Sequence, residues 1–186
     1  MKRITLAVLA AAGFTMAVAA PAAAQSGTTL GVGVGITNPM GNWKDKNVWG
    51  DKLGFHFGVG AGFALGSAPV RARVEGSYTQ TSHDGFSGKT KLLGGMVSLV
   101  YPFQTAGNIK PYVLAGIGVY NIKESVSDSS ETKVGFGGGA GVRFPMSSMS
   151  LFVEARYLTT GKAFGIAKFS QLPITVGVSF PLGAKK

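Results

Sequence analysis

The chain has 186 residues, a formal net charge of +10 and no cysteine, and 45% of its residues are hydrophobic. This length suits a single domain, and the absence of cysteine excludes both a disulfide framework and a lipid anchor on a cysteine. The positive charge favours anionic surfaces. The sequence has no basic helix and no basic patch interleaved with aromatic residues, so we expect no nucleic-acid partner.

The N-terminal segment has the pattern of a secretory signal peptide. Lys2 and Arg3 precede an apolar run from Ile4 to Ala20, and Ala22-Ala23-Ala24 offers small residues to a signal peptidase. We therefore expect residues 1–24 to be a cleavable signal peptide and residues 25–186 to form one exported domain.

From Thr29 onward, apolar residues alternate with glycine, hydroxyl-bearing or charged residues, which is typical of β-strands. The clearest strand runs from Leu53 to Leu65, where Phe55, Phe57 and Val59 share one face while His56 and the glycines share the other. Eight strands are predicted, at Thr29 to Thr37, Leu53 to Leu65, Val70 to Tyr78, Thr90 to Phe103, Ile109 to Ile122, Thr132 to Phe144, Ser150 to Leu158 and Gln171 to Leu182. In Thr90 to Phe103 and Ile109 to Ile122 both faces contain apolar residues, so their orientation stays open.

The number and length of these strands favour an all-β fold, an eight-stranded antiparallel up-and-down transmembrane β-barrel. An even number of strands permits simple closure, and a tilted strand needs about nine to eleven residues to cross a bilayer. The connections should alternate in length. Tight turns are predicted at Gly66 to Pro69, Gln104 to Asn108 and Pro145 to Met149, and longer external loops at Met40 to Lys52, Thr81 to Lys89, Lys123 to Glu131 and Thr159 to Ser170.

The face opposite the apolar one is rich in glycine and carries few charges, of both signs, as expected of a crowded lumen. Because an unpaired buried charge is costly, we expect an internal ion-pair network. Its candidate members are Arg71, Arg73, Glu75, Arg143, Glu154 and Arg156. The glycines are explained by tight curvature, with a ligand cavity as the alternative. Aromatic residues near strand ends suggest interfacial girdles, at Tyr78, Tyr101, Phe103, Tyr112, Phe144, Tyr157 and Phe180.

Motifs with catalytic or ligand-binding chemistry have weak support. Gly135 to Ala140 matches a relaxed dinucleotide fingerprint but is followed by strand residues instead of a helix. Ser82, His83 and Asp84 are adjacent residues of a connection that we expect to be solvated, as is the acidic segment Asp45 to Asp51. We predict no catalytic residue, no cofactor and no metal site.

Basic residues cluster around the first two predicted loops. Their ammonium groups could bind the phosphates of lipopolysaccharide, and ordinary loop solubility is an equally good explanation. The candidate residues are Lys44, Lys46, Lys52, Lys89 and Lys91.

Four stretches together give the chain its resemblance to a known family. They are Phe57 to Phe63, Val70 to Tyr78, Pro111 to Gly118 and Leu151 to Tyr157. In their order and spacing the chain resembles the small outer-membrane β-barrels of the OmpA/OmpX and opacity-like type. The resemblance implies insertion by the barrel-assembly machinery, which recognises a last strand of alternating apolar residues ending in an aromatic residue. Ile174, Val176, Val178 and Phe180 match that signal, although the chain continues beyond Phe180.

These observations favour a monomeric protein of the cell outer membrane with a structural or interaction role and no enzymatic activity. Its external loops would contact lipopolysaccharide or extracellular surfaces. The alternative is a narrow pore or a carrier for small or apolar solutes. Two further alternatives are a lipid A-modifying enzyme and a soluble periplasmic ligand-binding barrel with the apolar face inward. The enzyme lacks support because neither His56 nor His83 begins the His-x-Ser pattern of the deacylases.

Overall fold

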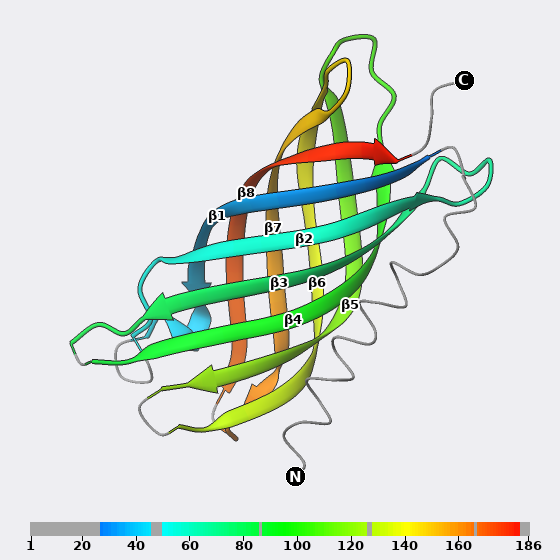
Figure 1. Cartoon of the computed structure of the whole chain (residues 1–186). Helices are drawn as coiled ribbons and strands as arrows, with labels where there is room; N and C mark the ends of the chain where they lie inside the picture. The colour runs from blue at the N-terminus through cyan, green and yellow to red at the C-terminus, as the bar shows by residue number, and fades with distance from the viewer. Residues whose placement is uncertain (1–26, 46–49, 86, 126–127, 166, 183–186) are drawn as a thin grey trace.

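Eight antiparallel strands form a closed barrel in which each strand pairs with its sequence neighbours and β8 pairs with β1 (Figure 1). The computed structural model describes residues 27–45, 50–85, 87–125, 128–165 and 167–182, so the predicted signal peptide lies outside the described residues. The strands are β1 (Thr28–Met40), β2 (Gly54–Ala64), β3 (Arg71–Ser82), β4 (Lys89–Pro102), β5 (Lys110–Glu124), β6 (Ser130–Pro145), β7 (Ser150–Ala163) and β8 (Ala167–Leu182). The predicted eight-stranded up-and-down barrel is confirmed.

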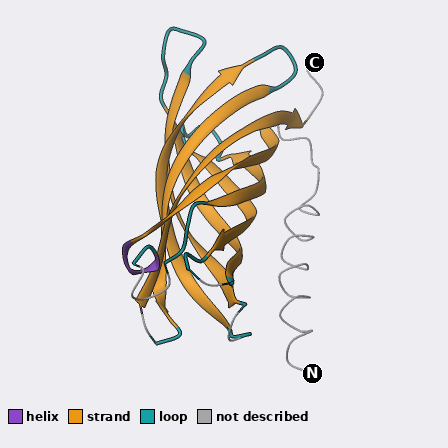
Figure 2. Ribbon diagram, turned by 90° about the vertical axis from the view of Figure 1, so that its left-hand side faces the viewer, coloured by secondary structure: helices purple, strands orange, loops and turns teal. Residues whose placement is uncertain are grey.

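Helical structure is minimal in the part of the chain that is described. A 3-10 turn, η1 (Gly41–Trp43), follows β1 (Figure 2). None of the described helical residues belongs to a helix long and apolar enough to span a membrane.

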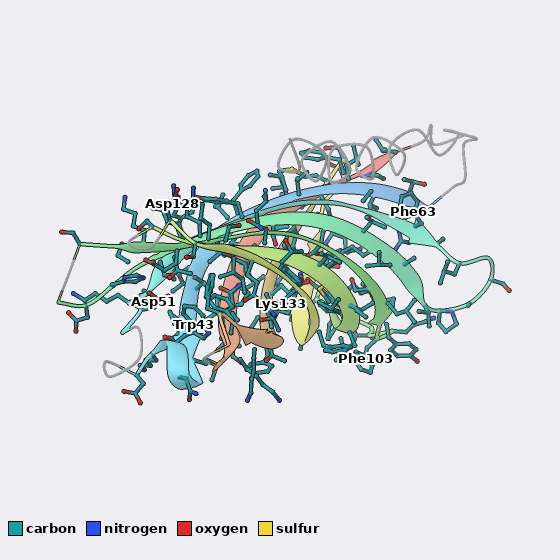
Figure 3. All side chains as sticks on the ribbon, turned by 90° about the horizontal axis from the view of Figure 1, so that it is seen from below. Trp43, Asp51, Phe63, Phe103, Asp128 and Lys133 are labelled. Carbon is teal, nitrogen blue, oxygen red and sulfur yellow. The ribbon has the colours of Figure 1, made fainter. Side chains whose placement is uncertain are left out.

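The two ends of the barrel differ. Connections 65–70, 103–109 and 146–149 lie at one end, together with the paired residues Thr28 and Leu182, and we call this the turn end. Connections 41–53, 83–88, 125–129 and 164–166 lie at the opposite end, which we call the loop end. Figure 3 shows Asp51 and Asp128 toward the loop end and Phe63 and Phe103 toward the turn end.

The predicted alternation of short turns and long loops is wrong, because the strands continue into three of the predicted loops. Ser82 pairs with Lys89, and Lys162 pairs with Lys168 across a tight hairpin. Only connection 41–53 is longer than every connection at the turn end. Where a strand extends beyond the apolar belt, its residues are polar and have the composition of a loop. The sequence pattern therefore predicted strands that are too short at the loop end.

The outer surface of the barrel is an apolar belt. The side chains of Val34, Phe136 and Val176 are each more than half exposed, and exposed apolar residues come from β1, β2 and β4 to β8. In β3, Val74 lies opposite the exposed Val97 of β4 and so faces the same surface. Val32 of β1 lies opposite Val59 of β2 and Val178 of β8, as the period of two predicts. This arrangement excludes the alternative in which the apolar face points inward.

Aromatic pairs mark both edges of the belt. Tyr101 and Phe103 are in edge contact near the turn end, with ring centroids 5.2 Å apart, and Phe55 packs on Tyr78 near the loop end. Tyr112 does not belong to a girdle, because its side chain points into the lumen and is only 3% exposed. The sequence could not place Tyr112, since β5 carries apolar residues on both faces.

Inward-facing aromatic rings occupy much of the space that the glycines leave. A Cβ atom at Gly94 or Gly118 would collide with the ring of Tyr120. In the same way, the ring of Tyr112 covers Gly141, and that of Phe152 covers Gly177. Part of the glycine-rich face therefore lacks side chains because large aromatic rings pack directly against its backbone.

Candidate functional site

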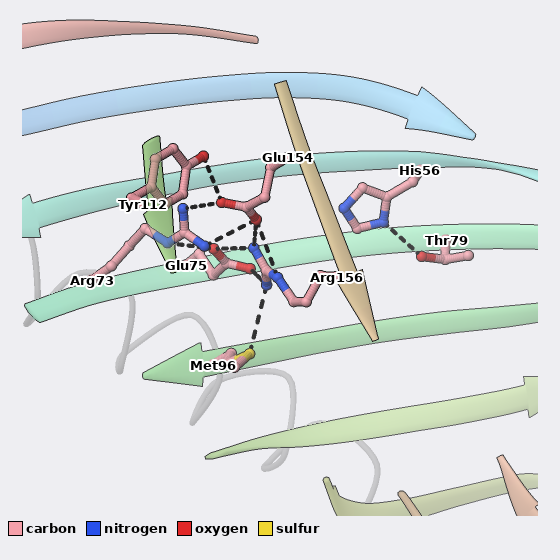
Figure 4. Close-up of polar contacts among 8 residues, drawn as sticks. All are labelled: His56, Arg73, Glu75, Thr79, Met96, Tyr112, Glu154 and Arg156. Carbon is pink, nitrogen blue, oxygen red and sulfur yellow. Dashed lines mark hydrogen bonds and ion pairs between the residues drawn. The ribbon is translucent and has the colours of Figure 1, made fainter. Parts of the chain in front are cut away.

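The centre of the lumen holds a network of two arginines and two glutamates from β3 and β7 (Figure 4). Within each strand the two members are two residues apart, so they point to the same side. Arg73 binds both oxygens of Glu154, with Nη1–Oε2 and Nη2–Oε1 distances of 2.7 and 3.1 Å. Arg156 contacts Glu75 and Glu154, and the Arg73 Nε atom lies 3.1 Å from Glu75 Oε2. Each carboxylate is thus shared by both arginines.

Neighbouring groups complete the network. The hydroxyl of Tyr112 donates a hydrogen bond of 2.9 Å to Glu154 Oε2, and Met96 Sδ lies 3.6 Å from Arg156 Nη1. Farther along the lumen, His56 Nδ1 and Thr79 Oγ1 are 2.9 Å apart, so His56 is an internal hydrogen-bonding group (Figure 4). With every carboxylate oxygen of the network occupied by a donor, the network has the character of a structural cross-brace between β3 and β7.

The structure brings four of the six predicted network residues together and places the other two nearer the turn end. Arg71, the first residue of β3, donates from Nη2 to the backbone oxygen of Gly27. Arg143 lies over the ring of Tyr112, with its Cζ atom 5.8 Å from the ring centroid. Within the described parts of the chain, Arg71 and Arg143 form no ion pair.

A cavity of about 80 Å³ lies in the turn-end half of the lumen. All four arginines and both glutamates line it, together with a wall of glycines from β1 and β2 and the hydroxyl-bearing residues Thr29, Thr175 and Ser179. Part of the space beside the glycines is therefore an open cavity, and part is filled by aromatic rings. That the cavity holds a ligand, the alternative explanation for the glycines, stays a prediction.

An apolar cluster fills the lumen between the ion-pair network and the loop end. Trp43 of η1 is fully buried and packs edge-on against Phe169 of β8, with ring centroids 4.6 Å apart. The remaining members are Leu92, Met96, Tyr120, Ile122, Leu158 and Ala163. Trp43 was not predicted to be a lumen residue, because it lies in a connection and no alternation pattern includes it.

A polar cluster at the loop end ties connection 41–53 to the barrel. Asp51 Oδ1 lies 3.1 Å from His83 Nε2, which is 3.0 Å from Thr90 Oγ1, and Thr81 Oγ1 donates to Asp51 Oδ2 at 3.0 Å. Burial raises the pKa of Asp51 to about 6, and it lowers the pKa of His83. Asp51 and His83 are almost completely buried, so the prediction that both lie in solvated connections is wrong. The pair is joined by tertiary packing that local sequence does not encode.

The candidate lysines lie at the loop end. Lys44, Lys52, Lys89 and Lys91 are exposed, and Lys46 lies outside the described residues. Lys52 pairs with Asp84 at 2.7 Å. On the outer surface, Lys91 lies directly opposite Lys123, and Lys162 lies directly opposite Lys168. Neither of these pairings was predicted from the sequence.

The candidate insertion signal lies on the outer face of β8. Ile174, Val176 and Phe180 are 40–54% exposed and alternate with the inward-facing Thr175 and Ser179, and Val178 follows the same alternation. The strand continues through Pro181 to Leu182. Among the described residues, no group of three or more histidine, aspartate or glutamate side chains is arranged to hold a metal ion.

Comparison with known proteins agrees with this architecture. Residues 6–180 match a family model described as outer membrane protein beta-barrel domain. The fold is similar to that of Neisserial surface protein A, with a TM-score of 0.70 and 22% identity over 84% of this chain and 98% of that one. It is also similar to a major outer membrane protein from Thermus thermophilus, with a TM-score of 0.53 and 11% identity over 82% of this chain and 98% of that one. The outer membrane enzyme PagL shares 18% identity at a TM-score of 0.51, over 83% of this chain and 99% of that one. No curated protein sequence matches the chain.

Proposed function

Because the chain belongs to the outer membrane protein β-barrel family, we propose that it is an outer-membrane anchor whose loop end binds the phosphates of lipopolysaccharide. In this proposal the signal peptide directs export, the barrel-assembly machinery inserts the mature domain through β8, and the turn end faces the periplasm. The apolar belt supports the membrane part of the proposal, since a wide apolar outer surface on a closed barrel suits lipid and not water.

The observation that carries the lipopolysaccharide contact is the direct opposition of lysines on the outer surface. Like charges opposite each other on neighbouring strands destabilise a sheet. Lys162 and Lys168 occupy such positions near the tip of the β7–β8 hairpin. Lys91 and Lys123 do so on β4 and β5, where Lys123 also pairs with Asp128. Within the described residues no carboxylate forms an ion pair with Lys162 or Lys168. An external polyanion at this height would relieve the repulsion.

The lumen supports a non-conducting, non-enzymatic role. The apolar cluster around Trp43 and Phe169 occupies the loop-end half of the barrel, which disfavours a continuous aqueous path. His56 lies within hydrogen-bond distance of Thr79, and His83 lies beside Asp51 and Thr90 in the buried polar cluster, so both histidines have the surroundings of structural groups.

The test is the stability of the folded chain in phosphatidylcholine bilayers with and without lipopolysaccharide, measured by urea unfolding. In phosphatidylcholine alone, Lys168→Gln should stabilise the barrel, because it removes the repulsion with Lys162. With lipopolysaccharide the sign should reverse, and the wild type should be the more stable of the two. Lys110→Gln, at the turn end, is the matched control and should respond to lipopolysaccharide as the wild type does. Equal stabilisation of wild type and Lys168→Gln by lipopolysaccharide would contradict the proposal.

A further inference from the structure

We infer that the turn-end cavity of the lumen binds a phosphate-type oxyanion between the guanidinium groups of Arg71 and Arg143. This site is distinct from the lysines of the loop end, and it does not depend on them. It lies inside the barrel, beside the central ion-pair network.

The first support is the balance of charge around the cavity. Four arginines and two glutamates line it, so two positive charges are left without a counter-charge. Both carboxylates are already shared by Arg73 and Arg156. The excess charge therefore belongs to Arg71 and Arg143. Enclosing two cations without a counter-ion is costly, and an anion in the cavity would offset that cost.

The second support is that both guanidinium groups retain free donors. A guanidinium group has five N–H donors. Arg71 uses one Nη atom on the backbone oxygen of Gly27, and the Nε atom of Arg143 is buried without a hydrogen-bond partner. The ring of Tyr112 beneath Arg143 holds the guanidinium group in place, as cation–π contacts do. A positioned guanidinium group recognises an oxyanion through two parallel hydrogen bonds.

The third support is the shape and lining of the cavity. Its volume of about 80 Å³ is several times the ~10–15 Å³ that one ordered water molecule needs, so it can hold a small tetrahedral anion. Glycines of β1 and β2 keep one wall free of side chains, and Thr29, Thr175 and Ser179 line the same cavity with hydroxyl groups that can donate to an anion. The site combines cations, hydroxyl donors and open space.

The oxyanion could be a free phosphate or the phosphate of a lipid headgroup. Arg71 begins β3 beside connection 65–70, and Arg143 lies two residues before the end of β6. Both are therefore close to the turn-end mouth, where a phospholipid headgroup and a soluble anion would each have access.

The experiment uses the full mature chain, folded in neutral maltoside micelles at constant ionic strength set with chloride. Inorganic phosphate is titrated and followed by ³¹P NMR line width. We expect saturable binding in the wild type and an affinity at least tenfold lower in Arg143→Gln and in Arg71→Gln. Lys133→Gln removes the same charge from the loop-end part of β6, outside the cavity and away from Arg143, and it should bind as the wild type does. Absence of saturation in the wild type, or unchanged binding in both arginine variants, would overturn the inference.

Two additional arms distinguish the source of the anion and the role of geometry. In the first arm, dihexanoyl-phosphatidic acid replaces inorganic phosphate. Tighter binding than that of phosphate assigns the site to a lipid headgroup, and equal or weaker binding assigns it to a free oxyanion. Arg143→Lys keeps the charge and loses the planar fork, so it should bind more weakly than the wild type and more tightly than Arg143→Gln. Folding of each variant is checked by the gel-mobility difference between boiled and unboiled samples.

Discussion

Arg73 of β3 and Glu154 of β7 join opposite walls of the barrel through a two-point ion pair, with N–O distances of 2.7 and 3.1 Å. The two residues are 81 positions apart in the chain, so the contact forms only when the barrel has closed. It also fixes how β3 and β7 face each other across the lumen.

Glu154→Gln should strongly destabilise the barrel. The substitution leaves Arg73 and Arg156 with Glu75 as their only remaining network carboxylate, and breaking a buried ion pair on one side costs on the order of 3–5 kcal/mol. The measurement is the free energy of unfolding in urea, in lipid vesicles. Asp128→Asn is the control, because it removes an exposed pair with Lys123 and should cost less than about 1 kcal/mol. A loss for Glu154→Gln no larger than that of the control would show that the network is not a brace.

Gly139→Ala and Gly58→Ala should differ although both glycines face the lumen. A Cβ atom at Gly139 would overlap the backbone oxygen of Ala155 on β7, whereas at Gly58 the nearest atom would be His56 Nε2, 3.7 Å away. We expect Gly139→Ala to fold in low yield or with a loss of more than about 2 kcal/mol, as overpacking produces. Gly58→Ala should fold normally. Equal yields of folded, heat-modifiable protein would contradict the close approach of the strands.

Trp43→Ala should destabilise the barrel by about 3–5 kcal/mol, as removal of a fully buried aromatic side chain does. Phe169→Ala should have a similar effect, and the double variant should lose less than the sum, because the two rings are in contact. Leu53→Ala is the control in the same connection, since its side chain is 58% exposed. Additive losses in unfolding experiments would mean that Trp43 and Phe169 do not pack together.

The Asp51–His83 pair should shape the pH dependence of stability. Asp51, with a pKa raised from 3.8 to about 6, binds its proton more tightly in the folded state, so its contribution to stability grows as pH falls from 6 toward 4. His83 has a lowered pKa, so its contribution is lost as pH falls below 6.5. Burial is the main cause of both shifts. The charge of the buried Glu124 adds to the raised pKa of Asp51 and partly opposes the lowered pKa of His83.

Asp51→Asn and His83→Gln should therefore change the pH dependence of the free energy of unfolding in opposite directions. Between pH 7 and pH 5, Asp51→Asn should lose more stability than the wild type, because only the unfavourable protonation of His83 remains. His83→Gln should lose less than the wild type or gain. The profile of Asp128→Asn should run parallel to that of the wild type. Parallel profiles for all three variants would show that Asp51 and His83 do not titrate as a buried pair.

Period-two alternation was sufficient to predict the strand number, the barrel topology and which face of β2 or β3 points outward. It placed Arg73, Glu75, Glu154 and Arg156 on the lumen face because charges alternate there with apolar residues. It could not state which charges pair, since partners such as Arg73 and Glu154 are distant in the sequence.

The sequence failed where long-range packing decides the outcome. Trp43, Asp51 and His83 belong to connections, which have no periodic pattern, and their burial depends on contacts with β4 and β8. Tyr112 lies on a strand with two apolar faces, so alternation carries no information on its direction. Lys162 and Lys168 were both predicted to lie in a loop, so the sequence did not indicate that they pair across the β7–β8 hairpin.

We expect the barrel to lie in a membrane with its apolar belt toward lipid. The most direct measurement is fractionation of cells that express the full precursor, followed by electrophoresis of boiled and unboiled samples. We expect an outer-membrane protein whose mobility changes on boiling, because a closed barrel resists detergent until it is heated. A soluble periplasmic protein with the same mobility in both samples would contradict it.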